Sequence, residues 1–288
     1  MTVAGQPVVN YTFDNANRLA QITQGTSTVS FAYDSDGRRA SLTLPNGVTV
    51  IYNYDNGSQL TGLTDTLGSN TLGNLSYAYD LAGRRINMGG SFARTGLPQP
   101  VSSTAYNAAN RLTQWGAATL TYDLNGNLTG DAVNTYQWDA RNQLATINSG
   151  VTASFQYDPL GRRTSKTVAG AATAFLYDDV NVVQELSGTT PIANLLTGLG
   201  PDEIFTRTDS AGTRHLLTDA LGSTLALADA GGNILTQYTY EPFGNVSITG
   251  SVFNPYQYTG RENDGTGLYY YRARYYNPTL QRDRKSVV

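Results

Sequence analysis

The chain has 288 residues, enough for one large domain or two smaller ones with a sizeable buried core. Its net charge is −3 and only 14% of its residues are charged, so the composition does not indicate broad electrostatic attraction to nucleic acid or to an anionic membrane. The absence of cysteine excludes disulfides and thiolate metal sites, and no apolar run approaches the roughly 18 residues that a membrane helix needs.

A short unit recurs along the chain from Tyr11 onward, and residues 155–163 are its fullest copy. Two aromatic residues flank one other residue, which places both rings on one face of an extended strand. An aspartate then opens a type I turn, where its side chain can bond the backbone two residues on, and a glycine accepts the left-handed exit. Each unit therefore predicts a strand, a turn and the start of a returning strand.

The predicted turn residues either open or close these turns. They are Asp14, Asp34 with Gly37, Asp80 with Gly83, Asp123 with Gly126, Asp139, Asp158 with Gly161, Asp219 with Gly222, and Gly244 after a glutamate. Many successive turns lie about twenty residues apart, a period that indicates a repeat architecture. Because an isolated hairpin is marginal in water, neighbouring hairpins must pack side by side.

The expected fold class is therefore all-β, with tandem β-hairpin repeats in a large antiparallel sheet. Strand twist coils so long a sheet, so we expect it to spiral into part of a hollow shell. Residues 87–104 interrupt the rhythm with Gly and Pro, and we expect a surface loop there rather than a domain boundary. The period is lost from about Val182, and Leu195 and Leu196 are expected on a short helix or an irregular strand.

The ordered Tyr-Asp repeats resemble those of the RHS/YD-repeat proteins. Residues 215–224, 238–244, 256–264 and 267–278 resemble the repeat-associated core of that family. The resemblance implies hairpin repeats at 1–181, the core region at 182–282 and a tail at 283–288. It also implies a large bacterial protein, secreted or at the cell surface, whose shell encloses a variable C-terminal toxin. Residues 1–13 themselves predict no signal peptide.

By this resemblance the chain is a structural part of a shell that encapsulates and helps to deliver a toxin. The implied partners are the toxin cargo and neighbouring repeats, with secretion machinery or surface glycans as further partners. No cofactor, nucleic acid or membrane span is expected. In that family the core often cuts itself, using aspartates near an Asp-Pro-x-Gly segment that follows the Arg-Tyr-Tyr stretch. This sequence stops short of that segment, so no enzymatic activity is expected here. The resemblance makes Arg261, Asp264, Arg272 and Arg274 candidates for a buried ionic cluster that plugs the shell end.

The final residues 283–288 depart from the family pattern. They match the in-frame translation of a common sequencing adapter that begins GATCGGAAGAGC. We therefore expect these six residues to be non-native and the gene to continue differently after Arg282.

Several residue groups allow a functional interpretation beside a structural one. Asp34 and Asp36 resemble the opening of a calcium loop, but the ligand expected at the twelfth position is replaced by Pro45, which favours a repeat turn. His215, Asp219 and Ser223 have the residue types of a catalytic triad, but they lie within one strand and turn.

The remaining alternatives concern carbohydrate binding. The arginine pairs at 38–39, 84–85 and 162–163 could form a carbohydrate- or phosphate-binding row. We favour a local role, in which one arginine of each pair binds a turn aspartate or stacks on a tyrosine while the other is solvated. The tyrosines at 269–271 and 275–276 could stack on sugars or pack inside the shell. A carbohydrate-binding adhesin is therefore the alternative function.

Overall fold

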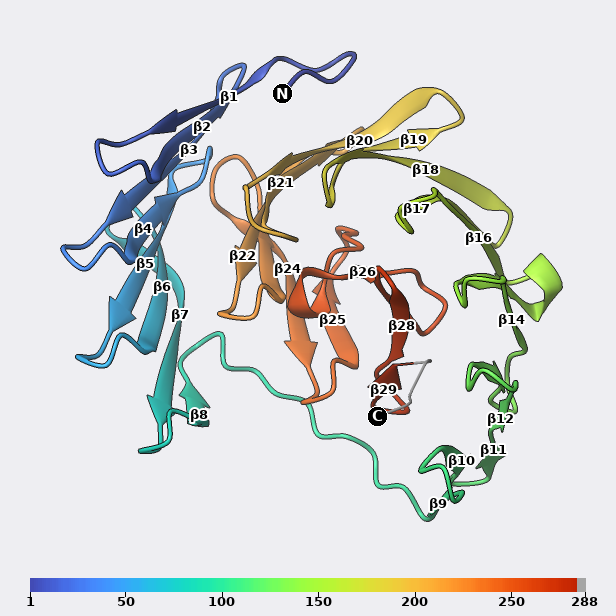
Figure 1. The fold of residues 1–288 in the computed structure, drawn as a ribbon. Coiled ribbons are helices and arrows are strands. Elements are labelled where there is room, and N and C mark those ends of the chain that lie inside the picture. The colour runs from blue at the N-terminus through green and yellow to red at the C-terminus, as the bar shows by residue number, and fades with distance from the viewer. Residues whose placement is uncertain (284–288) are drawn as a thin grey trace. The chain divides into compact units, whose positions relative to one another are not determined.

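The computed structural model describes residues 1–283, and these are almost entirely β structure (Figure 1). The chain forms two compact units. Unit 1 comprises residues 1–95, 193–239 and 247–254, and unit 2 comprises residues 96–192, 240–246 and the part from residue 255 onward. Each unit thus combines predicted repeats with part of the predicted core region. The first division falls between Thr95 and Gly96, inside the segment that we expected to be a loop rather than a boundary.

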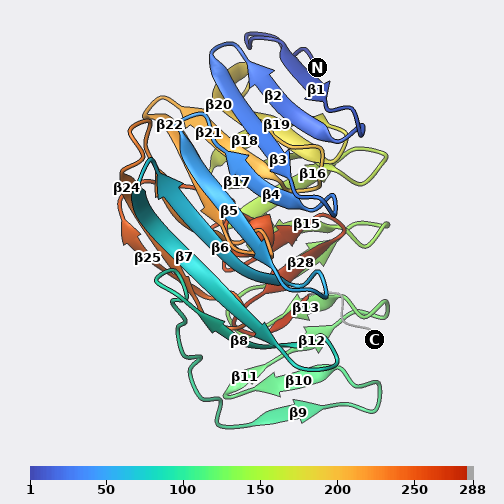
Figure 2. The same cartoon turned by 90° about the vertical axis from the view of Figure 1, so that its left-hand side faces the viewer.

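Unit 1 contains a sheet of eight antiparallel strands that pair in chain order (Figure 2). The strands are β1 (Val9–Phe13), β2 (Leu19–Gln24), β3 (Ser27–Tyr33), β4 (Arg39–Thr43), β5 (Val48–Tyr54), β6 (Leu60–Leu67), β7 (Asn70–Tyr79) and β8 (Arg85–Gly89). Later strands that lie wholly or mostly in this unit are β20 (Thr190–Thr197), β21 (Ile204–Asp209), β22 (Gly212–Thr218), β23 (Thr224–Ala228), β24 (Ile234–Tyr240) and β25 (Val246–Gly250). Phe31 meets Phe205 edge to face at 5.8 Å between ring centroids, joining the two groups of strands.

Unit 2 is built from shorter hairpins. Its repeat strands are β9 (Thr104–Tyr106), β10 (Leu112–Trp115), β11 (Ala118–Thr119), β12 (Thr121–Tyr122), β13 (Leu128–Gly130), β14 (Tyr136–Trp138), β15 (Leu144–Ile147), β16 (Ala153–Tyr157), β17 (Arg163–Val168), β18 (Ala171–Asp178) and β19 (Asn181–Ser187). The C-terminal strands are β26 (Glu262–Asn263), β27 (Tyr269–Tyr271), β28 (Arg274–Asn277) and β29 (Arg282–Asp283). Two 3-10 helices, η1 (Asn148–Gly150) and η2 (Tyr258–Gly260), complete the regular elements of residues 1–283.

The turn between β16 and β17 shows how the repeat sequence determines the hairpin. The amide of Gly161 donates to the carbonyl of Asp158 at 3.0 Å, and Gly161 has a φ of 85°. The Oδ1 atom of Asp158 accepts hydrogen bonds from the amides of Leu160 and Arg162, both at 2.9 Å. The sequence analysis predicted the bond to the residue two positions on, and the bond to the residue four positions on is additional. The same pair of bonds to the residues two and four positions on is made by Asp14, Asp34, Asp55, Asp80, Asn107, Asp139, Asp219 and Asp229.

The remaining predicted turns follow the same plan with small changes. The Oδ1 atom of Asp123 accepts from the amide of Asn127 at 2.8 Å, and Gly126 closes that turn with a φ of 83°. Gly244 closes the turn opened by Glu241, with a φ of 89°. A Cβ atom at Gly244 would also lie 2.5 Å from the ring of Tyr258, so both backbone conformation and space require glycine there.

A hydrogen bond from the second aromatic residue joins each of several hairpins to the one before it. The hydroxyl of Tyr157 donates to the carbonyl of Leu144, the first residue of the preceding returning strand, at 2.8 Å. The same bond to the preceding hairpin is made by Tyr33, Tyr54, Tyr79, Tyr122, Trp138 and Tyr177. This explains why the second aromatic residue of these hairpins carries a donor, while the first aromatic position holds Phe as readily as Tyr.

The structure also describes the two segments in which the repeat rhythm is lost. Leu195 and Leu196 lie in strand β20, whose register with β21 shifts between Leu196 and Thr197. The alternative of an irregular strand is therefore confirmed, and that of a short helix is wrong. Both side chains are buried, and apolar residues on both faces of a strand obscure the alternation that would have identified it. In the segment after β8 the ring of Phe92 is buried against Gly73, where a Cβ atom would lie 2.2 Å from it. No helix in residues 1–283 is long and apolar enough to cross a membrane.

Candidate functional site: a buried ionic cluster in unit 2

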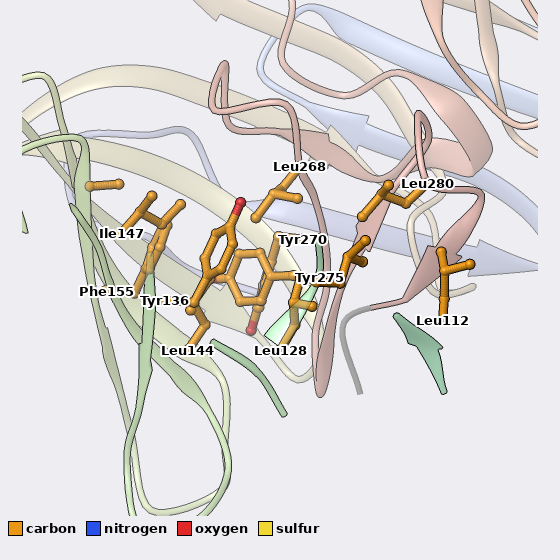
Figure 3. Close-up of a cluster of buried hydrophobic side chains, with 12 residues drawn as sticks. Leu112, Leu128, Tyr136, Leu144, Ile147, Phe155, Leu268, Tyr270, Tyr275 and Leu280 are labelled. Carbon is orange, nitrogen blue, oxygen red and sulfur yellow. The ribbon is translucent and has the colours of Figure 1, made fainter. Parts of the chain in front are cut away.

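The core of unit 2 joins the repeats to the C-terminal strands. Leu128 and Leu144 begin returning strands of repeat hairpins, and their buried side chains lie in one cluster with Tyr270 and Tyr275 from β27 and β28 (Figure 3). The ring of Phe155 lies 5.1 Å from that of Tyr275, measured between centroids. The inner face of these repeats is therefore covered by the hairpin that β27 and β28 form.

Arg163 occupies the same repeat position as these leucines, at the start of β17, and its side chain is fully buried. Its guanidinium carbon lies 4.0 Å from the ring centroid of Tyr270 and 5.4 Å from that of Phe155. The backbone amide of Arg163 donates to the hydroxyl of Tyr270 at 3.0 Å. Arginine stacks well on aromatic faces and is more weakly hydrated than lysine, so it suits this buried position.

Two carboxylates from the C-terminal strands bind the guanidinium of Arg163. Asp264 accepts two hydrogen bonds, from Nη1 at 2.6 Å and from Nη2 at 2.9 Å. Glu262 accepts a third from Nη2 at 2.5 Å. Paired bonds from one guanidinium to one carboxylate fix orientation as well as distance, so β26 and the segment after it are held in register with β17.

Lys166 completes the buried ionic cluster, which we define as Arg163, Lys166, Glu262 and Asp264. Its Nζ atom lies 2.7 Å from Glu262 and 3.1 Å from Asp264. The cluster thus contains two cations and two anions, so its formal charges cancel. This balance matters because removing one partner of a buried ion pair leaves an uncompensated charge away from water.

Within the cluster the pKa values of Glu262 and Lys166 are both shifted in the direction that favours the charged form. Burial alone would raise the pKa of Glu262, but Lys166 and Arg163 outweigh it and lower that pKa. Burial would likewise lower the pKa of Lys166, yet Glu262 and Asp264 raise it. Because the pKa of Glu262 in the folded chain lies below its ordinary value of 4.5, this group stabilises the fold at pH values above 4.5. That contribution is lost as the pH falls through the pKa of the folded chain. The pKa of Lys166 in the folded chain lies above its ordinary value of 10.5, so this group stabilises the fold at pH values below 10.5. That contribution is lost as the pH rises through the pKa of the folded chain.

The tyrosines around the cluster are held in their neutral form. Burial raises the pKa of Tyr275 well above its ordinary value, although the nearby Arg163 opposes that rise. The Tyr275 hydroxyl accepts a hydrogen bond from Nη1 of Arg163 at 3.1 Å and lies 2.9 Å from the hydroxyl of Tyr157. The carboxylate oxygens of Glu262 and Asp264 are all engaged by cations. This arrangement suits a fixed clamp between strands better than proton transfer.

Of the four residues predicted for an ionic cluster, the structure places only Asp264 in this one. The guanidinium of Arg261 lies over the ring of Tyr271 at 5.2 Å. Arg272 donates to the carbonyl of Val180 at 3.5 Å, and Arg274 pairs with Asp283 at 2.5 Å. Arg261 and Arg272 are half-buried and Arg274 is exposed, whereas Glu262 and Asp264 are buried.

The cations of the cluster come instead from Arg163 and Lys166, which the sequence analysis did not identify. Arg163 stands at a repeat position where some hairpins have leucine, such as Leu128 and Leu144, and where two others have Arg39 and Arg85. Because Arg85 is exposed, an arginine at this position does not by itself predict a buried partner.

The arginine pairs are partly as predicted. The first arginine of each pair binds its turn aspartate at 2.7 Å, in the pairs Arg38–Asp34, Arg84–Asp80 and Arg162–Asp158. The expectation that the second arginine is solvated is wrong for Arg39 and Arg163. Arg39 lies over Phe31 at 4.9 Å and pairs with Glu203 at 2.6 Å. In both hairpins a register shift before the turn pairs the second arginine with the second aromatic residue, while its guanidinium lies over the ring of the first.

The contacts of the possible calcium loop, catalytic triad and tyrosine-rich stretch favour structural roles. Asp36 pairs with Arg38 at 3.2 Å within a repeat turn. Asp219 accepts from the amides of its own turn, while the Nδ1 atom of His215 is buried and makes no hydrogen bond within the described chain. Among the clustered tyrosines, Tyr269, Tyr270 and Tyr275 are buried, which favours packing over stacking on sugars.

Comparison with known proteins identifies the family. The sequence pattern of the teneurin YD-shell matches residues 48–282. The chain belongs to the teneurin YD-shell family. The resemblance to RHS/YD-repeat proteins is therefore confirmed.

The YD-shell chain is also similar to much longer bacterial proteins. It is 29% identical to the tRNA3(Ser)-specific nuclease WapA of Bacillus spizizenii, covering 93% of this chain and 14% of that protein. It is 25% identical to the double-stranded DNA deaminase toxin A of Burkholderia cenocepacia, covering 96% of this chain and 24% of that protein. The chain thus spans less than a quarter of either relative.

A solved structure of the Photorhabdus luminescens Tc holotoxin pore superposes with a TM-score of 0.71 at 18% identity. The match covers 97% of this chain and 19% of that one. At this identity the likeness concerns the fold alone, and it confirms the prediction of all-β hairpin repeats that belong to a shell.

Proposed function

We propose that this YD-shell chain is part of the wall that encloses a toxin polypeptide and helps to deliver it. The observation that carries the proposal is the buried ionic cluster, in which the C-terminal strands are fastened to the inner face of a repeat hairpin by Arg163 and Asp264. A wall that must retain a polypeptide needs such non-local links, because hairpins joined only to their neighbours can separate locally. The names of the nuclease and deaminase relatives support a toxin as the cargo.

In this proposal the chain contributes no chemistry of its own, and the toxic activity belongs to the enclosed polypeptide. The protein acts outside the producing cell, either secreted or at the cell surface. Its partners are the cargo and the adjoining repeats of the complete shell. The burial of Tyr269, Tyr270 and Tyr275 supports this role over that of a glycan-binding adhesin, since rings that stack on sugars must be open to solvent.

The test is protease protection of the complete gene product, cloned from genomic DNA and purified. We expect its toxin segment to resist protease in the wild type and to become sensitive in the variant Asp264→Asn. The variant Arg84→Gln changes an exposed turn arginine and should retain protection. A toxin segment that is cleaved equally fast in the wild type would overturn the proposal. Binding to a glycan array without any protection would support the adhesin instead.

A further inference from the structure

In several hairpins the arginine four residues after the turn aspartate makes two contacts. Arg38 binds the Oδ2 atom of its own turn residue, Asp34, at 2.7 Å. Its guanidinium carbon also lies 4.6 Å from the ring centroid of Tyr54, the second aromatic residue of the next hairpin. The same arrangement is made by Arg18 with Asp14 and Tyr33, and by Arg162 with Asp158 and Tyr177. Neighbouring hairpins thus form a guanidinium site from one carboxylate and one ring.

The hairpin that begins its turn at Asp139 has the carboxylate and the ring but not the arginine. Gln143 stands four residues after Asp139, and Tyr157 is the second aromatic residue of the next hairpin. The Oδ1 atom of Asp139 accepts the two turn bonds, but its Oδ2 atom makes no hydrogen bond or ion pair within residues 1–283. No guanidinium or ammonium group of this part of the chain lies over the ring of Tyr157.

Gln143 does not take over the contacts of the missing arginine. Its Nε2 atom donates to the carbonyl of Gly161 at 3.4 Å, and not to Asp139. The amide of a glutamine ends where the guanidinium of an arginine begins, and it carries no charge. Asp139 is accordingly exposed, whereas the turn aspartates that bind an arginine are half-buried, namely Asp14, Asp34, Asp80 and Asp158.

A cavity of about 580 Å³ lies where this arginine would be, between the β14–β15 and β16–β17 hairpins of unit 2. Asp139, Gln143 and Tyr157 all line it. Its volume is within the range of binding sites for small molecules. Asp158 lines the cavity as well, but its carboxylate is bound to Arg162 at 2.7 Å. The carboxylate of the cavity that lacks a cation within the described chain is therefore that of Asp139.

The remaining charged residue of the lining is Arg141, at the turn end of the cavity. It is exposed, and its Nη1 atom donates to the carbonyl of Pro159 at 3.2 Å. It makes no ion pair with any carboxylate of residues 1–283. A small cation that entered the cavity alone would be repelled by Arg141. A ligand with a cation at one end and a carboxylate at the other would be attracted at both ends.

We propose that this cavity binds free arginine. The guanidinium of the ligand lies between the Oδ2 atom of Asp139 and the ring of Tyr157, as the chain's own arginines do in the neighbouring hairpins, and its carboxylate lies toward Arg141. A planar guanidinium suits both partners, because it donates parallel hydrogen bonds to a carboxylate and stacks on an aromatic face. This ligand site does not depend on the enclosure of a toxin.

The experiment is a calorimetric titration of the complete gene product with arginine and with citrulline. Citrulline has the shape of arginine but carries a neutral urea in place of the guanidinium. We expect it to bind about tenfold more weakly or less, the loss of one charge-assisted contact. Equal binding of the two amino acids, or no binding of arginine to the wild type, would overturn the proposal.

Three variants locate the site. Asp139→Asn removes the charge but keeps the turn, because Asn107 makes the same pair of turn bonds in its own hairpin, and it should bind arginine about tenfold more weakly. Gln143→Arg supplies the missing side chain, so it should raise the denaturation midpoint and abolish arginine binding. Asp34→Asn is the matched control, since Arg38 already binds that carboxylate, and it should leave arginine binding unchanged.

Two further ligands test the source of the guanidinium and the part of Arg141. Agmatine lacks the carboxylate of arginine and should bind more weakly than arginine does. Equal or tighter binding of agmatine would overturn the assignment to arginine. A tripeptide that ends in arginine and binds more than tenfold tighter than the free amino acid would overturn it in favour of a polypeptide C-terminus. Unchanged arginine binding in Asp139→Asn or in Gln143→Arg, with both variants folded by their denaturation midpoints, would place the site elsewhere and overturn the proposal.

Discussion

The β3–β4 hairpin of unit 1 and the β16–β17 hairpin of unit 2 share one sequence pattern but treat their second arginine differently. In both, the first arginine binds the turn aspartate and the second lies over the first aromatic ring. Arg39 remains partly exposed and pairs with one acid, Glu203, whereas Arg163 is fully buried between two acids and beside Lys166. The turn sequence thus sets the direction of the second arginine, and distant residues determine its burial.

The largest effect should come from Asp264→Asn, which removes one charge from the buried ionic cluster without changing its size. We expect a loss of about 3–5 kcal/mol in the free energy of unfolding, because a buried cation is left uncompensated. Urea denaturation followed by tryptophan fluorescence would measure it.

The counterpart in unit 1 is Glu203→Gln at the partly exposed pair with Arg39. Water screens this pair, so we expect a loss of at most about 1 kcal/mol. Equal losses for the two variants would show that burial does not distinguish the two hairpins.

The next largest effect on stability should come from Asp65, a buried acid of unit 1. Glu262 and Asp264 in unit 2 are bound by cations, whereas burial is the cause of the pKa shift of Asp65. Asp65 is 3% exposed, its Oδ1 atom makes no hydrogen bond within the described residues, and burial raises its pKa to about 7 from 3.8. The folded chain therefore retains a proton that the unfolded chain loses between these values. Stability should fall by up to about 4 kcal/mol as the pH rises from about 4 to about 7, then level off.

Asp65→Asn should abolish this dependence, because the amide does not ionise. Urea midpoints of wild type and variant at several pH values between these limits would show it. A wild-type midpoint that rises steadily over the same range, with no change in the variant, would contradict the assignment.

A smaller loss is expected when the charges are removed together. The quadruple variant Arg163→Met, Lys166→Met, Glu262→Met, Asp264→Leu replaces all four charged side chains of the cluster by apolar side chains of similar size. We expect it to lose less stability than Asp264→Asn alone, since no buried charge is stranded. A loss that exceeds that of the single variant would mean that the cluster contributes net stabilisation.

The smallest effects should come from the hydrogen bonds between hairpins. Tyr79→Phe removes one bond, to the carbonyl of Leu60, and should cost about 1 kcal/mol. Tyr157→Phe removes bonds to both Leu144 and Tyr275 and should cost more. Phe13→Tyr, at the same repeat position, serves as a near-neutral control. Calorimetric midpoints would rank the three variants.

The local part of the structure was predictable, and the non-local part was not. The turn residues Asp34 and Gly37 specify their hairpin by short-range backbone bonds, so the sequence pattern was sufficient. The pairing of Arg163 with Asp264 joins residues 101 positions apart, and no local pattern encodes it. The division into two units also depends on distant contacts, whereas the hydroxyl of a second tyrosine bonds only to the preceding hairpin.

The bond from a tyrosine to the preceding hairpin has a genetic consequence. Since each hairpin provides both the donor for the one before and the acceptor for the one after, a whole repeat can be duplicated or lost and the bonds re-form between the new neighbours. A single-residue insertion within a strand instead turns every later side chain to the opposite face. Unequal recombination between repeat-encoding DNA segments would thus alter the length of the wall in whole hairpins while leaving its mode of assembly intact.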